Sequence, residues 1–391
     1  MRLIGQRIRI DRNELSGAFG DIGTDLPLII GMLVASNMQV SYVFIAYGLM
    51  QILTALVYGI PMPVQPLKAV AMLVIVQHLP PGVIWGGGLA IGVIMLILTV
   101  TGIVDWIAKV IPKVIIRGIQ FGLGMQFALL ALKEYVGSTG GWGYAMAGVA
   151  FAVSLVFMGN RRFPPALFII PAGIIFSIVF HWNEFLNVRV TQVALPDISF
   201  PHWNEIITGL VVLALPQIPL SLGNSIIATH QLAKDYFPEK QVHIRKISLT
   251  YSLMNLINPF IGGIPVCHGS GGMAGHYTFG ARTGGSVFIY GLLFLALGLF
   301  FSGSFQTVIK VFPMPILGVI LFLEGLALMV LIKDIIDSRR NFMIALITGL
   351  MAAGLPYGFL VGMTVGTVIY YLSEDKVKYS IQLKILGRRA K

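Results

Sequence analysis

Charged residues and cysteine are both scarce in this chain. Only 11% of its 391 residues are charged, whereas a soluble domain carries about 25%, and the mean hydropathy is +0.85. This composition excludes a water-soluble globular protein. The single cysteine, Cys267, cannot form an internal disulfide, so the fold must rest on packing alone.

Motifs of enzymes and metal sites are also missing. The chain contains no nucleotide-binding loop and no H-E-x-x-H sequence. His268 and His276 have no third ligand at a spacing that suits a metal ion. We therefore expect no enzyme, no cofactor and no metal centre.

Long apolar runs fill the chain instead. Because one crossing of a bilayer takes about 20 apolar residues, the sequence predicts an all-α integral membrane protein with about fourteen spans. The first seven are predicted at residues 14–36, 42–58, 66–77, 84–104, 114–132, 144–158 and 166–181. The second seven are predicted at residues 206–230, 244–257, 270–281, 286–301, 316–332, 341–355 and 358–373.

The two sets of spans resemble each other at matching places. Gly-Ile-Pro at 59–61 recurs at 263–265, and Val-Ile-Pro at 110–112 corresponds to Val-Phe-Pro at 311–313. Because seven is odd, the second set enters the membrane in the opposite sense, which makes a 7+7 inverted repeat. We expect the first repeat, a connecting segment, the second repeat and a basic tail at 1–181, 182–205, 206–373 and 374–391.

The basic residues support this topology, because Lys and Arg concentrate on the cytoplasmic side of membrane proteins. With an internal N-terminus, 23 of the 27 basic residues fall inside, Lys133, Arg189 and Lys310 fall outside, and Lys68 lies within a span. We expect a multi-pass protein of the cell (inner) membrane with both termini in the cytoplasm. The net charge of +11 then needs no nucleic acid to explain it.

Spans three and ten begin with segments that a regular helix does not accommodate. Residues 61–68 contain three prolines and residues 265–272 contain three glycines. The sequence predicts extended backbone followed by short helices, with Pro66 at the first helical position, Gln65 as one cap and Ser270 as the other. Such breaks are tolerated only within protein or beside a watery cavity, so the pair indicates one shared site.

Two facing helix N-termini suit an oxyanion, because each carries about half a positive charge and several free N–H groups. Lys68 adds a charge at that depth, and its alternative role is a structural salt bridge with Asp21 or Asp25. In span eight, Gln217 and Asn224 offer neutral donors to an anion. The alternative is that the prolines beside Gln217 only kink the span and that neighbouring groups satisfy the amide. The predicted substrate-binding residues are Asp21, Thr24, Gln65, Pro66, Lys68, Gln217, Asn224, His268, Gly269, Ser270 and Gly271.

Ionisable groups inside spans are candidates for coupling transport to an ion gradient. Glu324, in span twelve, either carries a proton or fills a hydrogen-bonded packing role. The candidates for coupling to H⁺ or Na⁺ are Asp21, Asp25, Glu324 and His268.

Three segments of the chain resemble the signatures of the molybdate transporter family related to the sulfate permeases. They are residues 14–24, 61–68 and 265–272, and the resemblance covers essentially the whole chain. It implies a fold of the uracil-permease type, with spans one to four and eight to eleven as a core domain and the others as a gate. It also implies that the C-terminal regulatory domain of sulfate permeases is absent. Asp25 departs from the family pattern, which often has a small residue there.

These observations predict a secondary active transporter for molybdate that works by alternating access of core against gate. Another oxyanion such as sulfate is the first alternative. A nucleobase permease is the second, although Gln217 and His268 stand where such a permease needs a carboxylate. The coupling ion, the choice between molybdate and tungstate, and the oligomeric state, with a homodimer as one option, stay open.

Overall fold

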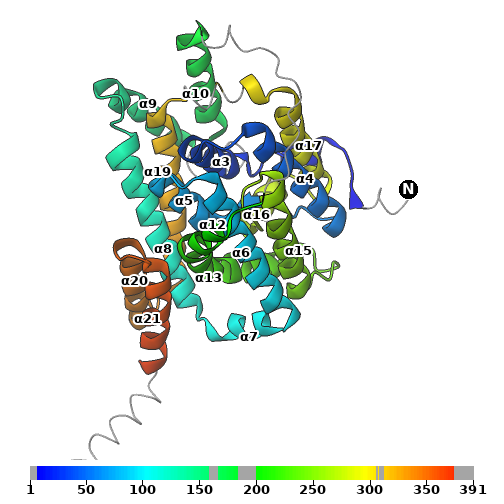
Figure 1. The fold of residues 1–391 in the computed structure, drawn as a ribbon, viewed down its shortest axis with the longest axis vertical. Coiled ribbons are helices and arrows are strands. Elements are labelled where there is room, and N and C mark those ends of the chain that lie inside the picture. The colour runs from blue at the N-terminus through cyan, green and yellow to red at the C-terminus, as the bar shows by residue number, and fades with distance from the viewer. Residues whose placement is uncertain (1–6, 158–165, 184–199, 305–306, 308–311, 374–391) are drawn as a thin grey trace, which may run out of the picture.

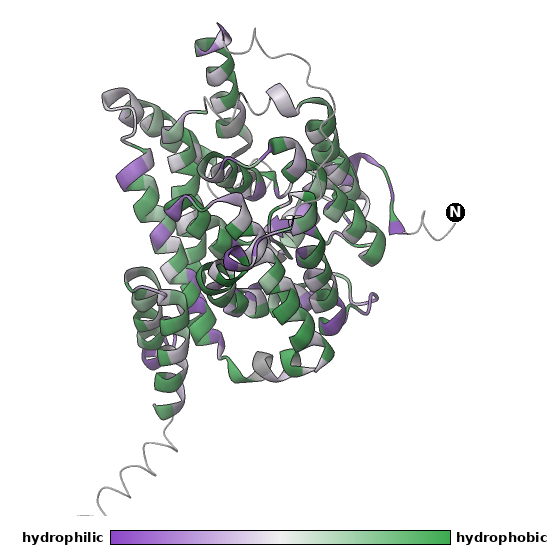
Figure 2. Ribbon diagram, viewed as in Figure 1, coloured by the Kyte–Doolittle hydropathy of each residue, from purple (hydrophilic) through white to green (hydrophobic). Residues whose placement is uncertain are grey.

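The computed structural model describes residues 7–157, 166–183, 200–304, 307 and 312–373. Over these ranges the chain is almost entirely helical, and apolar residues predominate along the helices (Figure 2). Five of the described helices are long and apolar enough to cross a membrane: Val40–Tyr58, Pro81–Val100, Lys113–Tyr135, Trp203–Tyr236 and Met314–Ile335. The expected membrane class therefore agrees with the structure, whereas the count of fourteen spans remains a prediction.

The first half of the chain follows the predicted ranges closely (Figure 1). Its elements are α2 (Arg12–Gly17), α3 (Ile22–Ser36), α4 (Val40–Tyr58), β1 (Val64–Pro66), α5 (Lys68–Gln77), α6 (Pro81–Val100), α7 (Ile103–Val110), α8 (Lys113–Leu130), η1 (Ala131–Tyr135), α9 (Gly141–Phe157) and α10 (Ala166–Phe180).

The second half begins with one long, locally widened helix made of α12 (Trp203–Gly209), η2 (Leu210–Ala214), α13 (Leu215–Leu220), η3 (Ser221–Ile227) and α14 (Ala228–Tyr236). It continues with α15 (Ile244–Ile257), η4 (Asn258–Ile261), β2 (Val266–His268), α16 (Ser270–Thr278), α17 (Gly285–Phe300), α19 (Met314–Val330), η5 (Leu331–Ile335), α20 (Arg339–Gly354) and α21 (Gly358–Leu372).

The first predicted span is not one helix. α2 ends at Gly17, and α3 begins after Asp21. The link lies against α16, since a Cβ atom on Gly20 would stand 2.5 Å from the carbonyl carbon of Gly275. This close packing of two backbones interrupts the polar first span. The fourth span also differs, because Gly102 adopts a positive φ of 74° and separates α6 from α7.

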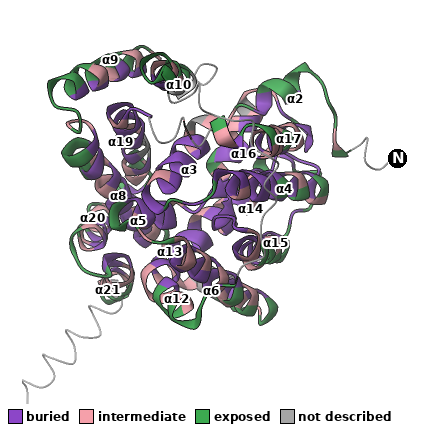
Figure 3. Ribbon diagram, turned by 45° about the horizontal axis from the view of Figure 1, so that its top comes forward, coloured by how far each residue is buried: buried purple, intermediate pink, exposed green. Residues whose placement is uncertain are grey.

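The helices pack in two groups. In one, α4 packs against α17 and α6 against α15; in the other, α8 packs against α19 and α20. Glycines allow the close approach within the second group: a Cβ on Gly122 would lie 2.5 Å from the carbonyl oxygen of Gly349. α3 and α5 lie centrally and are largely buried, whereas α9 and α10 stand at the periphery (Figure 3). The buried centre is where the two broken spans meet.

Candidate functional site

The two broken spans meet in a short antiparallel ribbon. β1 and β2 pair with Val64 opposite His268 and Gln65 opposite Cys267. The extended segments and the short helices α5 and α16 that follow them agree with the sequence prediction. The ribbon brings together residues about 200 positions apart, at the centre of the protein.

Buried amides hold each strand of the ribbon from behind. The backbone N–H of Val64 donates to Gln51 Oε1 at 2.9 Å, and Gln51 Nε2 donates to Val64 O at 2.7 Å. Asn255 makes the same pair of bonds with Val266, at 2.9 and 2.7 Å. Buried backbone groups need such partners. We did not predict Gln51 and Asn255, although an amide inside an otherwise apolar span was an available signal.

The start of α5 is capped by a side chain from another span. The amide oxygen of Gln217 accepts hydrogen bonds from the backbone N–H groups of Ala69, at 3.1 Å, and Val70, at 3.2 Å. The predicted cap was wrong: Leu67 occupies the N-cap and Pro66 lies in β1, because pairing with β2 keeps the backbone extended through Pro66. A neutral dipole therefore occupies N–H groups that an anion would otherwise use.

The start of α16 lies under Gln65. Gln65 Nε2 donates to both carboxylate oxygens of Asp21, at 2.7 and 2.8 Å. A Cβ atom on Gly269 would lie 1.5 Å from Gln65 Oε1, so the Gln65 amide lies directly against this helix start. Ser270 is not the cap as predicted. Gly269 holds that position with φ −101° and ψ 121°, and Ser270 begins the helix.

A small cavity of about 20 Å³ lies where these groups converge. Its volume suits about one water molecule, so it is contracted in this conformation. Two groups of helices form its wall, since α8 and α19 contribute as well as the ribbon. The lining residues are Gln65, Lys68, Gln120, Leu123, Gln217, Leu220, Asn224, Ser225, Cys267 and Leu328. Four predicted residues are therefore brought together, and Gln120 was missed because it lies in a span without any break.

Lys68 forms no ion pair among the described residues. The ion pairs of that part of the chain join Lys113 and Arg117 to Asp334. The alternative role for Lys68, a salt bridge with Asp21 or Asp25, is therefore not formed in this conformation. The ammonium group lines the cavity without an ionic partner.

A larger cavity of about 610 Å³ adjoins the small one. The two cavities share Gln120 and Asn224, whose side chains approach to 3.4 Å. Ser270 and Gly271 also line the larger cavity, and a Cβ atom on Gly271 would meet nothing within 4 Å. We refer to this larger cavity as the vestibule. Lys113 and Arg117 line it too, so basic side chains flank the approach to the small cavity.

The other predicted residues lie outside the lining of both cavities. Thr24 lies in the first turn of α3, where its N–H donates to Asp21 O at 3.0 Å. His268 Nε2 is 2.7 Å from Thr250 Oγ1, and its ring packs edge-on against Tyr58. The backbone of Glu324 lies in α19, but its side chain lies outside the described part of the structure.

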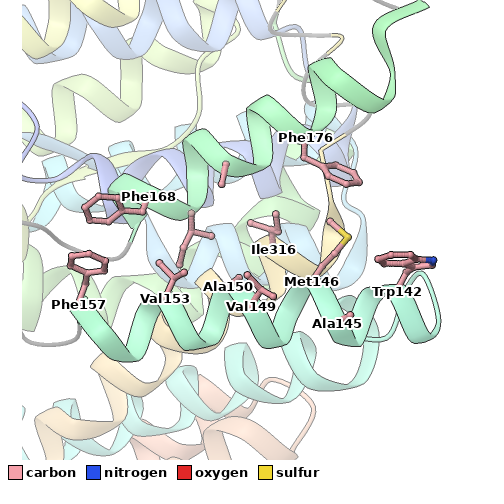
Figure 4. Close-up of a pocket in the computed structure, with 12 residues that line it drawn as sticks. Trp142, Ala145, Met146, Val149, Ala150, Val153, Phe157, Phe168, Phe176 and Ile316 are labelled. Carbon is pink, nitrogen blue, oxygen red and sulfur yellow. The ribbon is translucent and has the colours of Figure 1, made fainter.

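A separate groove of about 600 Å³ lies between α9 and α10, with Phe157 facing Phe168 at one end (Figure 4). Its walls are apolar, and Trp142 brings the one polar side-chain atom of the lining. The groove offers no cation for an anion. Its chemistry suits hydrocarbon, so we exclude it as a substrate site.

Comparison with known proteins decides the family. The sequence model described as "Molybdate transporter of MFS superfamily" matches residues 13–127 and 209–328, more than half of the chain. The chain belongs to the molybdate transporter family. The transporter is 31% identical to molybdate transporter 2 of Arabidopsis thaliana, over 92% of this chain and 87% of that protein. It is 28% identical to molybdate transporter 1 of the same plant, over 94% and 90% of the two chains. These relatives are transporters, and the chain is not an enzyme.

A more distant relative and two solved structures complete the comparison. The transporter is 26% identical to the benzoate membrane transport protein of Acinetobacter baylyi, over 72% of this chain and 71% of that one. Its fold matches the transmembrane domain of the cyanobacterial bicarbonate transporter BicA, with a TM-score of 0.64, 14% identity and coverage of 93% and 98%. It also matches murine Slc26a9 in the inward-facing state, with a TM-score of 0.70, 14% identity and coverage of 95% and 71%.

Proposed function

We propose that the transporter carries molybdate across the membrane by alternating access and that an H⁺ or Na⁺ gradient drives this transport. The observation that carries this proposal is the unpaired Lys68 in a cavity lined by neutral amides at the junction of the two broken spans. A tetrahedral dianion accepts hydrogen bonds at every oxygen and donates none. One ammonium group, amide N–H₂ groups and helix N–H groups match that demand.

The small volume of the cavity fits a transport cycle. At about 20 Å³ it is too small for a five-atom oxyanion. Movement of α8 and α19 against the ribbon would enlarge it, because both contribute to its wall. The vestibule beside it, lined by Lys113 and Arg117, would then be the route to the side that the basic residues mark as cytoplasmic.

The proposed binding groups are Lys68, Asn224 and the N–H groups at the starts of α5 and α16. Gln65 lines the site beside them, and its amide nitrogen is held by Asp21. Gln217 must leave the start of α5 before an anion can use Ala69 N and Val70 N. Such a move costs its hydrogen bonds to the helix, which the negative charge of the substrate would replace at higher strength.

We also propose that the chain is an inverted repeat with boundaries at 1–181 and 206–373. The paired clamps support this arrangement, since Gln51 holds Val64 as Asn255 holds Val266. Gly59 and Gly262, with φ of 64° and 69°, end the elements that precede the two strands in the same way. On this arrangement the protein spans the cell membrane with both termini in the cytoplasm.

Sulfate is the alternative substrate, because it is also a tetrahedral dianion. Benzoate and nucleobases fit less well, since no aromatic side chain lines the small cavity to stack on a ring. Uptake of labelled molybdate by liposomes containing the purified protein tests the proposal. Tungstate should compete at concentrations similar to molybdate, whereas benzoate and uracil should not compete. Stronger inhibition by sulfate than by unlabelled molybdate would transfer the assignment to sulfate.

Lys68→Gln tests the site within the same assay. We expect the affinity for molybdate to fall at least tenfold. The variant removes an unpaired charge that contributes about 1.4 kcal/mol or more to the free energy of binding. Lys113→Gln is the matched control, because Lys113 is exposed and already pairs with Asp334. A folded Lys68→Gln protein with unchanged affinity would reject this site.

A further inference from the structure

Asp25 is a buried carboxyl group outside the proposed binding site. It lies in the first turn of α3 and is 0% exposed. Two tyrosines from other helices reach the same oxygen, Oδ2: the Tyr47 hydroxyl at 2.5 Å and the Tyr290 hydroxyl at 3.3 Å. Among the described residues, Oδ1 has no hydrogen-bond partner and no ion pair involves Asp25. A carboxylate in such surroundings would be costly, because burial removes its hydration and no ion pair compensates for the loss.

Counting protons identifies the form that satisfies these contacts. The Tyr47 hydroxyl lies 2.5 Å from Asp25 Oδ2 and 2.6 Å from the carbonyl oxygen of Val64. A carbonyl oxygen only accepts, and a tyrosine hydroxyl has one proton to donate. With an ionised Asp25, the Tyr47 hydroxyl could donate to only one of these two oxygens. Its oxygen would then lie close to the other acceptor oxygen with no hydrogen between them. With a protonated Asp25, the carboxyl donates to Tyr47, and Tyr47 donates to Val64, so both short contacts are satisfied.

We infer that Asp25 is protonated in this conformation and that it is the group that carries the coupling proton. This inference rests on the proposed transport function and adds to it the choice of H⁺ and the residue that binds it. The chain from Asp25 through Tyr47 ends on Val64 of β1, whose neighbour Gln65 lines the small cavity. The proton therefore sits two hydrogen bonds away from the strand that forms the site.

Loss of the proton changes the bonds of that strand. Asp25 Oδ2–H gives its proton to water on the side to which the site opens, and the carboxyl becomes a carboxylate. Tyr47 then turns its hydroxyl hydrogen to the carboxylate and no longer donates to Val64. The Val64 carbonyl keeps its bond from Gln51 Nε2 alone, at 2.7 Å. Because binding linkage is reciprocal, a protonated Asp25 that favours the anion is itself favoured when the anion is bound.

The surroundings of Asp25 contain several other titratable groups. Asp21 is the N-cap residue of α3, Lys68 lies on α5, Tyr47 on α4 and Tyr290 on α17. His276 of α16 packs edge-on against Tyr290, with ring centroids 5.8 Å apart. On α19 the sole titratable residue is Glu324, whose side chain lies outside the described structure, and the residues of α10 include none. The side chain of Asp21 interacts with Asp25 and also accepts from Gln65, whereas Lys68 lines the cavity.

The test uses the purified full chain in liposomes with the membrane potential clamped at zero. Each proton carried down a gradient of one pH unit supports up to about a tenfold accumulation of substrate. We expect the unmodified protein to accumulate labelled molybdate when the outside is made acidic. Asp25→Asn keeps a donor toward Tyr47 without a titratable proton. It should lose the accumulation but retain exchange of labelled for unlabelled molybdate to within about threefold.

Tyr290→Phe is the matched control, because it removes the longer bond to Asp25 and leaves the path through Tyr47 to Val64 intact. It should accumulate molybdate as the unmodified protein does. Tyr47→Phe removes the hydrogen bonds that link Asp25 to Val64, so it should reduce the accumulation while exchange persists. This variant is the test if Asp25→Asn is not recovered as a monodisperse protein. Asp25→Asn or Tyr47→Phe with full accumulation would overturn the inference and leave molybdate transport standing. Failure of the unmodified protein to exchange molybdate would instead overturn the proposed function.

Discussion

The side-chain amide of Gln65 donates hydrogen bonds to both oxygens of the Asp21 carboxylate, at 2.7 and 2.8 Å. A carboxylate close to an anion site would repel the substrate if it faced the cavity. Here it is directed at the amide nitrogen instead, which leaves Gln65 Oε1 against Gly269. Asp21 is therefore a positioning residue that sets the orientation of an amide in the site.

Asp21→Asn should weaken the binding of molybdate by about tenfold. Asparagine keeps one acceptor oxygen but removes the charge, and a hydrogen bond to a charged partner contributes roughly 1.5–3 kcal/mol. Asp235→Asn is the control, since Asp235 is exposed in the vestibule and accepts from Gln231 at 2.7 Å. Equilibrium binding of molybdate measures both variants. Equal affinity in Asp21→Asn and the unmodified protein would contradict a positioning role.

Gly269→Ala should reduce transport to less than about a tenth. The added Cβ atom would lie 1.5 Å from Gln65 Oε1, so Gln65 must leave Asp21. Gly271→Ala should transport within about twofold of normal, because its Cβ atom would meet nothing within 4 Å. The sequence alone predicts both glycines as substrate-binding residues and does not separate them. Initial uptake rates per folded protein compare the two variants, and an inactive Gly271→Ala would place the anion at the vestibule end of α16.

Gln217→Glu should separate stability from transport. A carboxylate at this position still accepts from Ala69 N and Val70 N, and it interacts favourably with the helix N-terminus by about 0.3–1 kcal/mol. We expect an unchanged or raised Tm together with loss of molybdate binding, because the fixed negative charge occupies the donors. Gln77→Glu puts the same charge at the opposite end of α5 and should leave binding intact. A Gln217→Glu protein that still binds molybdate would show that these two N–H groups are not used.

Cysteine labelling tests the topology. The native Cys267 is 4% exposed, so its background reaction should be low. A cysteine at Pro80 should react with an impermeant reagent added outside whole cells, whereas a cysteine at Arg339 should react only after permeabilisation. Both positions are exposed at the ends of helices. Reaction of both from the same side would reject the fourteen-span arrangement.

The sequence by itself determined the class of protein and the location of its breaks. Apolar runs require a membrane, and three prolines in 61–68 cannot be helical in any surroundings, so these features depend on local chemistry alone. The ranges of α4, α9, α15 and α21 could be predicted for the same reason.

Only the tertiary structure decided which groups meet within the site. The caps at Leu67 and Gly269 depend on the pairing of β1 with β2, so local preferences for Gln65 and Ser270 did not decide them. Gln217 reaches the start of α5 from a helix about 148 positions away, and Gln120 enters the cavity from α8. No local pattern specifies such contacts. Each buried donor pairs with whichever acceptor the packing of the helices brings within about 3 Å. That packing is a property of the whole chain.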